Sequence, residues 1–149
     1  MITNNPNGEY KMTIAVVDGM GGGVGKAIVE ALARRCPDAE IWALGTNALA
    51  TSAMKKAGAH MAATGENAIC VSCRRADIVA GSLGIVLAES MMGEITPRIA
   101  HEISACNAQK MLIPTNKCHV NLIGVRDQPM GQQIDELTEQ IAAEIAKSK

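Results

Sequence analysis

The sequence predicts an α/β protein with one domain, in which a doubly wound, mainly parallel sheet of five to six strands carries helices on both faces. Three observations lead to this fold class. Short apolar, β-branched runs alternate with segments whose apolar residues recur every three or four positions. The first such run passes into a glycine-rich turn followed by a helix. The length of 149 residues suits one domain of ordinary size.

The first half of the chain predicts strands at residues 12–17, 40–44 and 60–63. The first of these, MTIAVV, is apolar almost throughout, which is typical of a strand buried on both faces. A helix follows from Val24 until Pro37 stops it, and a second helix ends at Gly58. Residues 68–76 fit a helix or a strand, and we favour a helix because parallel strands require a crossover between them.

The second half continues the alternation. We expect a strand at residues 77–80 and a helix over the apolar segment 85–92. Thr96 and Pro97 predict the start of the next helix, because a capping hydroxyl there precedes a proline at the first helical position. Further strands are predicted at residues 110–113 and 121–125. The closing helix is amphipathic, with an apolar face formed by Ile134, Leu137, Ile141 and Ile145.

Composition argues against several classes of partner. The formal net charge of −1 gives no basic field for nucleic acid, and the only aromatic residues are Tyr10 and Trp42. No apolar run reaches the roughly 18 residues of a membrane span. Residues 1–11 form a polar tail without a secretory signal. The number of cysteines, five, is odd and their spacing is not that of a disulfide framework, so we expect reduced thiols. We therefore expect a cytoplasmic protein with one domain over residues 12–149.

The most informative segment is the glycine-rich turn at residues 18–26, DGMGGGVGK. Glycines allow a phosphate to approach the backbone, and the helix that begins there offers unpaired N–H groups and the positive end of its dipole. A P-loop is excluded, because it requires Gly in place of Met20 and Ser or Thr in place of Ala27. The alternative is that the glycines only form a tight corner. The observed spacing is GxxxGxG, given by Gly19, Gly23 and Gly25.

This spacing resembles the cofactor turn of the short-chain dehydrogenases, whose Rossmann domain binds NAD or NADP. The resemblance extends over residues 13–46 and then ends. Asp18 replaces the Thr or Ser of those enzymes, and their Asn-Asn-Ala-Gly turn and Tyr-x-x-x-Lys are missing, so their mechanism does not carry over. The second strand ends in Gly45-Thr46-Asn47, without the acid of an NAD binder or the arginine of an NADP binder. The candidate cofactors are therefore NAD, NADP or another nucleotide.

Polar residues follow the predicted strands, and the carboxyl ends of parallel strands form one edge of the sheet where ligands bind. We predict a ligand site there because these residues converge on one edge, although each polar residue taken alone is better explained as a helix cap. Its residues are Asp18, Gly19, Gly21, Gly22, Gly23, Val24, Gly25, Lys26, Thr46, Asn47, Thr64, Asn67, Ser82, Thr115 and Asn116.

Carboxylates near these turns are candidates for chemistry. Asp18 could accept N–H groups of the glycine turn, hold a divalent ion or bind a ribose hydroxyl. Glu66 is the first candidate for a general base and Glu94 the second, but no catalytic residue can be assigned.

Cys70 and Cys73 form a CxxC pair that could act in thiol chemistry, or bind zinc together with Cys118 and His119. The pair lies inside a predicted helix rather than at its N-terminus, and the spacing of the second half is unusual for zinc. We therefore expect the two cysteines to be small core residues and predict no metal site.

Across most of residues 12–125 the pattern resembles a family of short bacterial proteins described only as a domain of unknown function. The resemblance implies a Rossmann-like fold and brings no reaction, substrate or catalytic residue. The matching segments are DGMGGGVGKA (18–27), ALGTNALATSAMKKAGA (43–59), ATGENAI (63–69), GEITP (93–97) and LIPTNKC (112–118).

The first hypothesis for function is a small Rossmann-like protein that binds a nucleotide, dinucleotide or other phosphate-bearing small molecule at the glycine turn. Neither nucleic acid nor a membrane is expected as a partner. A homo-oligomer is expected, because Met- and Ala-rich segments such as 85–92 can pack across an interface. Whether a reaction is catalysed stays open. The alternatives are a non-enzymatic ligand sensor or interaction module with the same pocket and, third, a zinc or thiol-redox protein.

Overall fold

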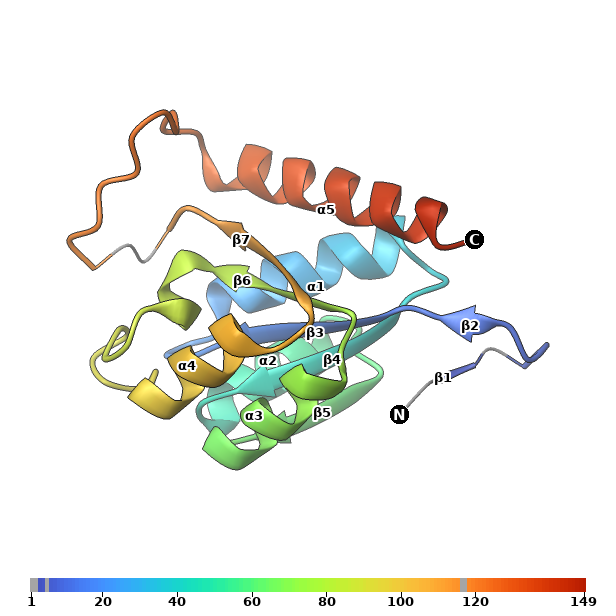
Figure 1. The fold of residues 1–149 in the computed structure, drawn as a ribbon, viewed down its shortest axis with the longest axis horizontal. Helices are drawn as coiled ribbons and strands as arrows, with labels where there is room; N and C mark the ends of the chain where they lie inside the picture. Colours follow the sequence, from blue (N-terminus) through green and yellow to red (C-terminus); the bar gives the residue numbers. More distant parts are fainter. Residues whose placement is uncertain (1–2, 5, 116–117) are drawn as a thin grey trace.

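The computed structural model describes residues 3–4, 6–115 and 118–149 (Figure 1). Its centre is a five-stranded, fully parallel sheet in the order β5-β4-β3-β6-β7. The strands are β3 (Thr13–Asp18), β4 (Glu40–Gly45), β5 (Met61–Thr64), β6 (Ile78–Ser82) and β7 (Gln109–Ile113). The predicted fold class is therefore confirmed, with five strands.

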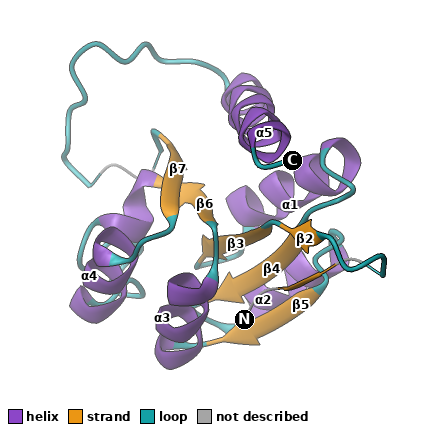
Figure 2. Cartoon of the chain, turned by 45° about the vertical axis from the view of Figure 1, so that its right-hand side comes forward, coloured by secondary structure: helices purple, strands orange, loops and turns teal. Residues whose placement is uncertain are grey.

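Helices cover both faces of this sheet. α1 (Gly23–Arg35), α2 (Ala48–Lys56) and α5 (Met130–Lys147) pack on one face, and α3 (Glu66–Arg75) and α4 (Pro97–Ala105) pack on the other (Figure 2). The ambiguous segment 68–76 is thus a helix, as predicted, and it forms the crossover between β5 and β6. No helix in the described part of the chain is long and apolar enough to cross a membrane.

The polar tail contains a short antiparallel ribbon that the sequence did not indicate. Its strands, β1 (Thr3–Asn4) and β2 (Tyr10–Lys11), pair with each other and form a sheet separate from the central one.

The helix predicted over residues 85–92 is wrong for most of its length. Only a 3-10 turn, η1 (Leu83–Val86), forms, and the chain then continues through turns to Ile95. Glu89, Met91 and Met92 adopt positive φ angles of 69°, 56° and 56°, a backbone conformation that ends any right-handed helix.

The strand predicted at residues 121–125 is also wrong. The segment has turns and no strand pairing, and Gly124 has a φ of 88°, which breaks an extended conformation. Ile123 is 95% exposed, so the apolar residues that suggested a strand do not reach the core.

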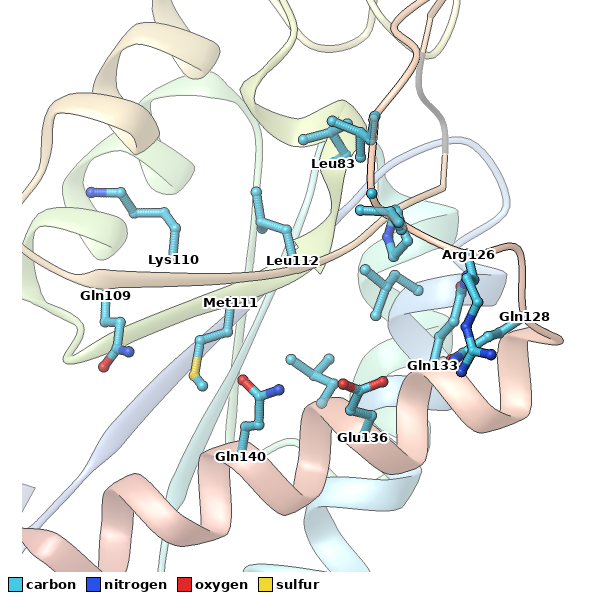
Figure 3. A pocket seen from close by; sticks show the side chains of 16 residues that line it. Leu83, Gln109, Lys110, Met111, Leu112, Arg126, Gln128, Gln133, Glu136 and Gln140 are labelled. Atoms are coloured by element: carbon cyan, nitrogen blue, oxygen red, sulfur yellow. The ribbon is translucent and has the colours of Figure 1, made fainter.

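This connection borders a cavity of about 600 Å³ between β7 and α5 (Figure 3). Met111 of β7 points toward α5, whereas Lys110 and Leu112 point to the opposite side of the strand. The cavity lies at the edge of the sheet, and the glycine turn does not line it.

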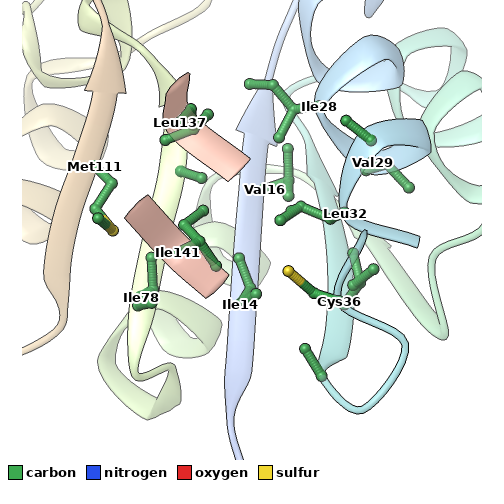
Figure 4. Packing of buried hydrophobic residues seen from close by; sticks show 14 of the residues in the cluster. Ile14, Val16, Ile28, Val29, Leu32, Cys36, Ile78, Met111, Leu137 and Ile141 are labelled. Atoms are coloured by element: carbon green, nitrogen blue, oxygen red, sulfur yellow. The ribbon is translucent and has the colours of Figure 1, made fainter. Parts of the chain in front are cut away.

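The core consists of two apolar clusters separated by the sheet. On the α1 side, Ile14 and Val16 of β3 pack against Leu32 of α1 and Ile141 of α5 (Figure 4). On the other side, Val17 packs in the cluster of residues from α3 and α4. β3 is therefore buried on both faces, as its apolar sequence predicts, and the glycine turn follows directly from this central strand.

Candidate functional site

The glycine turn lies at the carboxyl end of β3, where the strand order reverses. The chain proceeds from β3 to β4 on one side and later enters β6 on the other. Ligands of doubly wound α/β proteins bind in the crevice at such a point. The fold therefore places the glycine turn where the sequence analysis expects a site.

Asp18 ends β3 with a carboxylate that binds the glycine turn itself. Its Oδ1 accepts the N–H of Gly19 at 2.8 Å and its Oδ2 accepts the N–H of Gly25 at 2.6 Å. The residue is only 4% exposed. Burial raises the pKa of Asp18, the two amides lower it, and the charge of Glu94 adds to the rise. Of the roles considered for Asp18, acceptance of backbone N–H groups is the one the geometry supports.

Packing requires three of the glycines in the turn. A Cβ on Gly19 would lie 2.7 Å from Oγ1 of Thr46, and one on Gly22 would lie 2.8 Å from Cα of Ala50. Gly25 is closed off in the same way by the side chain of Asp18. Gly22 also has a φ of 75°. These glycines are explained by close packing of α1 against β3 and α2.

Gly21 and Gly23 differ from these three. A Cβ at either position would meet no atom within 4 Å, and neither residue has a positive φ. Neither internal packing nor backbone conformation therefore requires glycine at these two positions. The space above them is open to a molecule from solution.

The backbone N–H groups of the turn also fall into two groups, those bonded within the protein and those without an acceptor in the described part of the chain. The N–H groups of Met20, Gly22 and Gly25 are bonded to Glu94, Gly19 and Asp18. Those of Gly21, Gly23 and Val24 donate to no residue in the described part of the chain. They lie at the positive end of the α1 dipole and are available as donors to an anion.

Glu94 reaches the turn from a loop far along the sequence. Its Oε1 accepts the N–H of Met20 at 3.0 Å, the hydroxyl of Thr46 at 2.6 Å and Nδ2 of Asn47 at 2.7 Å. These bonds, that of Thr46 foremost, lower the pKa of Glu94 against a smaller opposing effect of burial. An ionised carboxylate is thus fixed between the ends of β3 and β4.

The loop that carries Glu94 is held in a strained conformation. Three non-glycine residues in it have positive φ, which costs energy and persists only where neighbouring contacts fix the backbone. The N–H of Glu89 donates to the carbonyl of Ile95 at 2.7 Å, and the hydroxyl of the buried Ser90 donates to the carbonyl of Gly84. These contacts keep the Glu94 carboxylate in place.

Thr46 and Asn47 belong to the same hydrogen-bonded group. Asn47 caps α2 through Oδ1, which accepts the N–H of Ala50 at 2.9 Å, and its Nδ2 donates to the carbonyl of Met20 as well as to Glu94. The structure therefore brings together Asp18, the glycine turn, both polar residues after β4, and Glu94.

The other predicted site residues show no side-chain hydrogen bond to the glycine turn in the described part of the chain, although the N–H of Lys26 donates to the carbonyl of Gly22 at 2.8 Å within the start of α1. Thr64 donates its hydroxyl to Thr51 at 2.7 Å, Ser82 is buried at the end of β6, and Asn67 and Lys26 are exposed. Thr115 follows β7, while Asn116 lies outside the described residues.

Glu66 connects two helices. Its Oε1 accepts the hydroxyl of Thr96 at 2.5 Å, and its Oε2 forms an ion pair with Arg98 at 3.5 Å. Thr96 in turn caps α4 by accepting the N–H of Ile99 at 3.1 Å. The geometry gives Glu66 a structural role between α3 and α4, and its role as a general base stays a prediction.

The cysteine pair lies in the core. Cys70 and Cys73 are buried on α3, and burial raises the pKa of both thiols, which disfavours the reactive thiolate. Cys118 is exposed beyond β7. Within the described ranges, no three His, Cys, Asp or Glu side chains gather as metal ligands would.

Sheet order, crossover helices and the glycine turn define a Rossmann-like α/β protein. Residues 13–146 match the family described as a domain of unknown function, DUF3842, and the chain belongs to that family. No curated protein and no solved structure matches the chain.

Proposed function

We propose that this protein binds a nucleotide, a dinucleotide or another phosphate-bearing small molecule at the glycine turn. The phosphate would accept hydrogen bonds from the N–H groups of Gly21, Gly23 and Val24. The main support is that Gly21 and Gly23 face open space, and that neither packing against the described residues nor backbone conformation requires glycine there. Close approach of a ligand to the backbone would explain them.

The charges around the turn indicate which anions would fit. Asp18 already satisfies one amide of the first α1 turn and partly neutralises the dipole, and Glu94 adds a second carboxylate. Lys26 is exposed in the same turn of α1 and supplies a cation. A phosphate diester, with one charge per phosphate, suits this balance better than a terminal phosphate with two.

A matched pair of variants tests the proposal. Gly23→Ala places a methyl group where the phosphate would approach. Gly131→Ala is the control: it makes the same substitution in the first turn of α5, away from the proposed site, where a Cβ also meets nothing within 4 Å. Titration calorimetry with NAD, NADP, ATP, GTP and sugar phosphates should show binding of at least one of these ligands to the wild type and, equally tightly, to Gly131→Ala. Binding to Gly23→Ala should be at least tenfold weaker. Equal binding to both variants, or no heat from any ligand with the wild type, would contradict the proposal.

A second candidate function is a sensor that binds the ligand without converting it. Both oxygens of Glu66, the first candidate for a general base, are occupied by the side chains of Thr96 and Arg98, which leaves this residue without a free acceptor for a ligand proton. Mass spectrometry of a bound ligand after long incubation separates the candidates, because an enzyme would alter the ligand and a sensor would not.

We further propose that the protein is cytoplasmic and self-associates. Its five cysteines are free thiols, which suits a reducing compartment. Ile123, Val125 and Met130, close together in the sequence, expose apolar side chains that a second copy could cover. Light scattering after size-exclusion chromatography tests self-association, and a monomer at high concentration would contradict it.

A further inference from the structure

Glu94 presents one carboxylate oxygen that the protein itself does not use. Oε1 accepts three hydrogen bonds, from Met20, Thr46 and Asn47, whereas Oε2 has no partner in the described part of the chain. No lysine or arginine in the described part of the chain forms an ion pair with this carboxylate. One oxygen therefore fixes the side chain, and the other remains available as a hydrogen-bond acceptor for a ligand.

The Glu94 carboxylate lies at the carboxyl end of β4. In doubly wound nucleotide sites, an acid beyond the second strand accepts a hydrogen bond from a ribose hydroxyl. In this chain the second central strand, β4, ends at Gly45 and is followed by Thr46 and Asn47, neither of which is an acid. Glu94 is hydrogen-bonded to both, so a distant loop supplies the missing carboxylate at the end of β4.

Exposed apolar side chains lie on the same segments. Met20, which is 49% exposed, belongs to the glycine turn and bonds Glu94 through its amide. Leu49, which is 69% exposed, lies in the first turn of α2, and Met92, which is 93% exposed, lies two residues before Glu94. These flexible apolar groups suit the face of a nucleobase next to a ribose at Glu94.

We infer that Glu94 is the residue that determines ligand specificity at this site, and that it selects a nucleotide whose ribose carries a free 2′-hydroxyl over one whose ribose carries a 2′-phosphate. This inference rests on the proposed function. A hydroxyl donates to Oε2 of Glu94, whereas a 2′-phosphate places a second anion against an ionised carboxylate that forms no ion pair within the described part of the chain. NAD is therefore preferred to NADP.

The test compares NAD, NADP and inorganic pyrophosphate as probes in titration calorimetry at pH 7.5 and low salt. We expect the wild type to bind NAD at least tenfold more tightly than NADP. Glu94→Gln should reduce this ratio to less than threefold, because Met20, Thr46 and Asn47 hold the amide oxygen in the Oε1 position, and the neutral NH₂ group in the Oε2 position donates to a hydroxyl or a phosphate alike. Glu89→Gln is the control, since it removes the same charge from an exposed residue of the same loop and should leave the ratio unchanged.

The outcomes separate the two proposals. If none of the probes binds, the proposed function is wrong. If pyrophosphate binds but NAD and NADP bind equally well or not at all, only the assignment of Glu94 is overturned. An unchanged ratio in a folded Glu94→Gln variant overturns it as well. If that variant does not fold, the wild-type ratio measured at 0.05 M and 0.5 M salt decides, because charge repulsion predicts that the ratio falls as salt increases.

Discussion

At the scale of single residues, the glycine turn holds two carboxylates in opposite electrostatic environments. Burial dominates at Asp18 and raises its pKa, whereas hydrogen bonds dominate at Glu94 and lower its pKa. Each carboxylate also accepts a backbone N–H of the turn. The two residues therefore shape the turn and set the charge that a ligand encounters.

The lowered pKa of Glu94 predicts a pH-dependent contribution to stability. A carboxyl whose pKa is lower in the folded than in the unfolded state stabilises the fold above the unfolded value of about 4.5, and the contribution is lost as the pH falls through the folded value. Glu94→Gln should therefore be less stable than the wild type at pH 7, and the difference should shrink toward pH 3. Urea denaturation at both pH values measures this, and an equal difference at both would contradict it.

Asp18→Asn tests the internal cap of the turn. An asparagine offers one oxygen to amides that now bond two, and its NH₂ group faces an N–H donor. Leaving a buried amide without an acceptor costs about 1–3 kcal/mol. We expect the free energy of unfolding to fall by about that amount in urea titrations. A loss within the error of the measurement would show that the cap is dispensable.

At the scale of secondary-structure elements, the start of α1 serves packing on one side and solvent on the other. Gly22 lies against the backbone of Ala50 in α2, and Gly23, the next residue, lies in the open. The start of α1 thus packs closely against α2 and still leaves N-terminal amides of α1 open to solvent.

This contrast predicts opposite effects of the same substitution at neighbouring positions. Gly22→Ala forces a Cβ into the backbone of α2 at positive φ and should destabilise the protein by roughly 1–3 kcal/mol. Gly23→Ala should stabilise it by up to about 1 kcal/mol, because alanine favours a helix over glycine. Thermal unfolding followed by circular dichroism compares them, and equal melting temperatures would contradict the assigned packing.

The elements show why sequence predicts some parts and not others. Residues 12–17 predict β3 because a strand covered on both faces needs an unbroken apolar run. Residues 85–92 mislead because their apolar side chains follow an irregular path with left-handed non-glycine residues, which periodicity does not reveal.

The sequence predicts only part of the candidate site, because local patterns reveal turns but not contacts between residues far apart in the chain. The glycine turn, Thr46 and Asn47 are visible as turns after strands. The contact between Glu94 and Met20 joins residues 74 positions apart, and no local pattern encodes it. The sequence indicates Glu94 only as the second candidate for a general base, because its position beside β4 depends on the tertiary structure.

At the scale of the whole molecule, α5 closes the α1 face of the sheet. Its apolar residues Ile134, Leu137 and Ile141 pack in the same cluster as α1 and β3 (Figure 4). The last helix in the sequence thereby supports the first strand and the turn that follows it.

Ile141→Ala tests this support. The side chain is fully buried, and truncation of such a residue to alanine costs about 2–5 kcal/mol in lost burial and cavity formation. Guanidinium denaturation should show a loss in that range with the cooperative transition preserved. A change much smaller than this would mean that α5 does not pack on the sheet in solution.

The central claim is that the open amides of the glycine turn bind phosphate, and amide NMR spectra of the ¹⁵N-labelled protein titrated with NAD test it most directly. The account predicts that the signals of Gly21, Gly23 and Val24 shift most and saturably, and that the signal of Gly131 stays in place. Absence of shifts at these amides at millimolar NAD, or saturable shifts only at a different surface, would contradict the account.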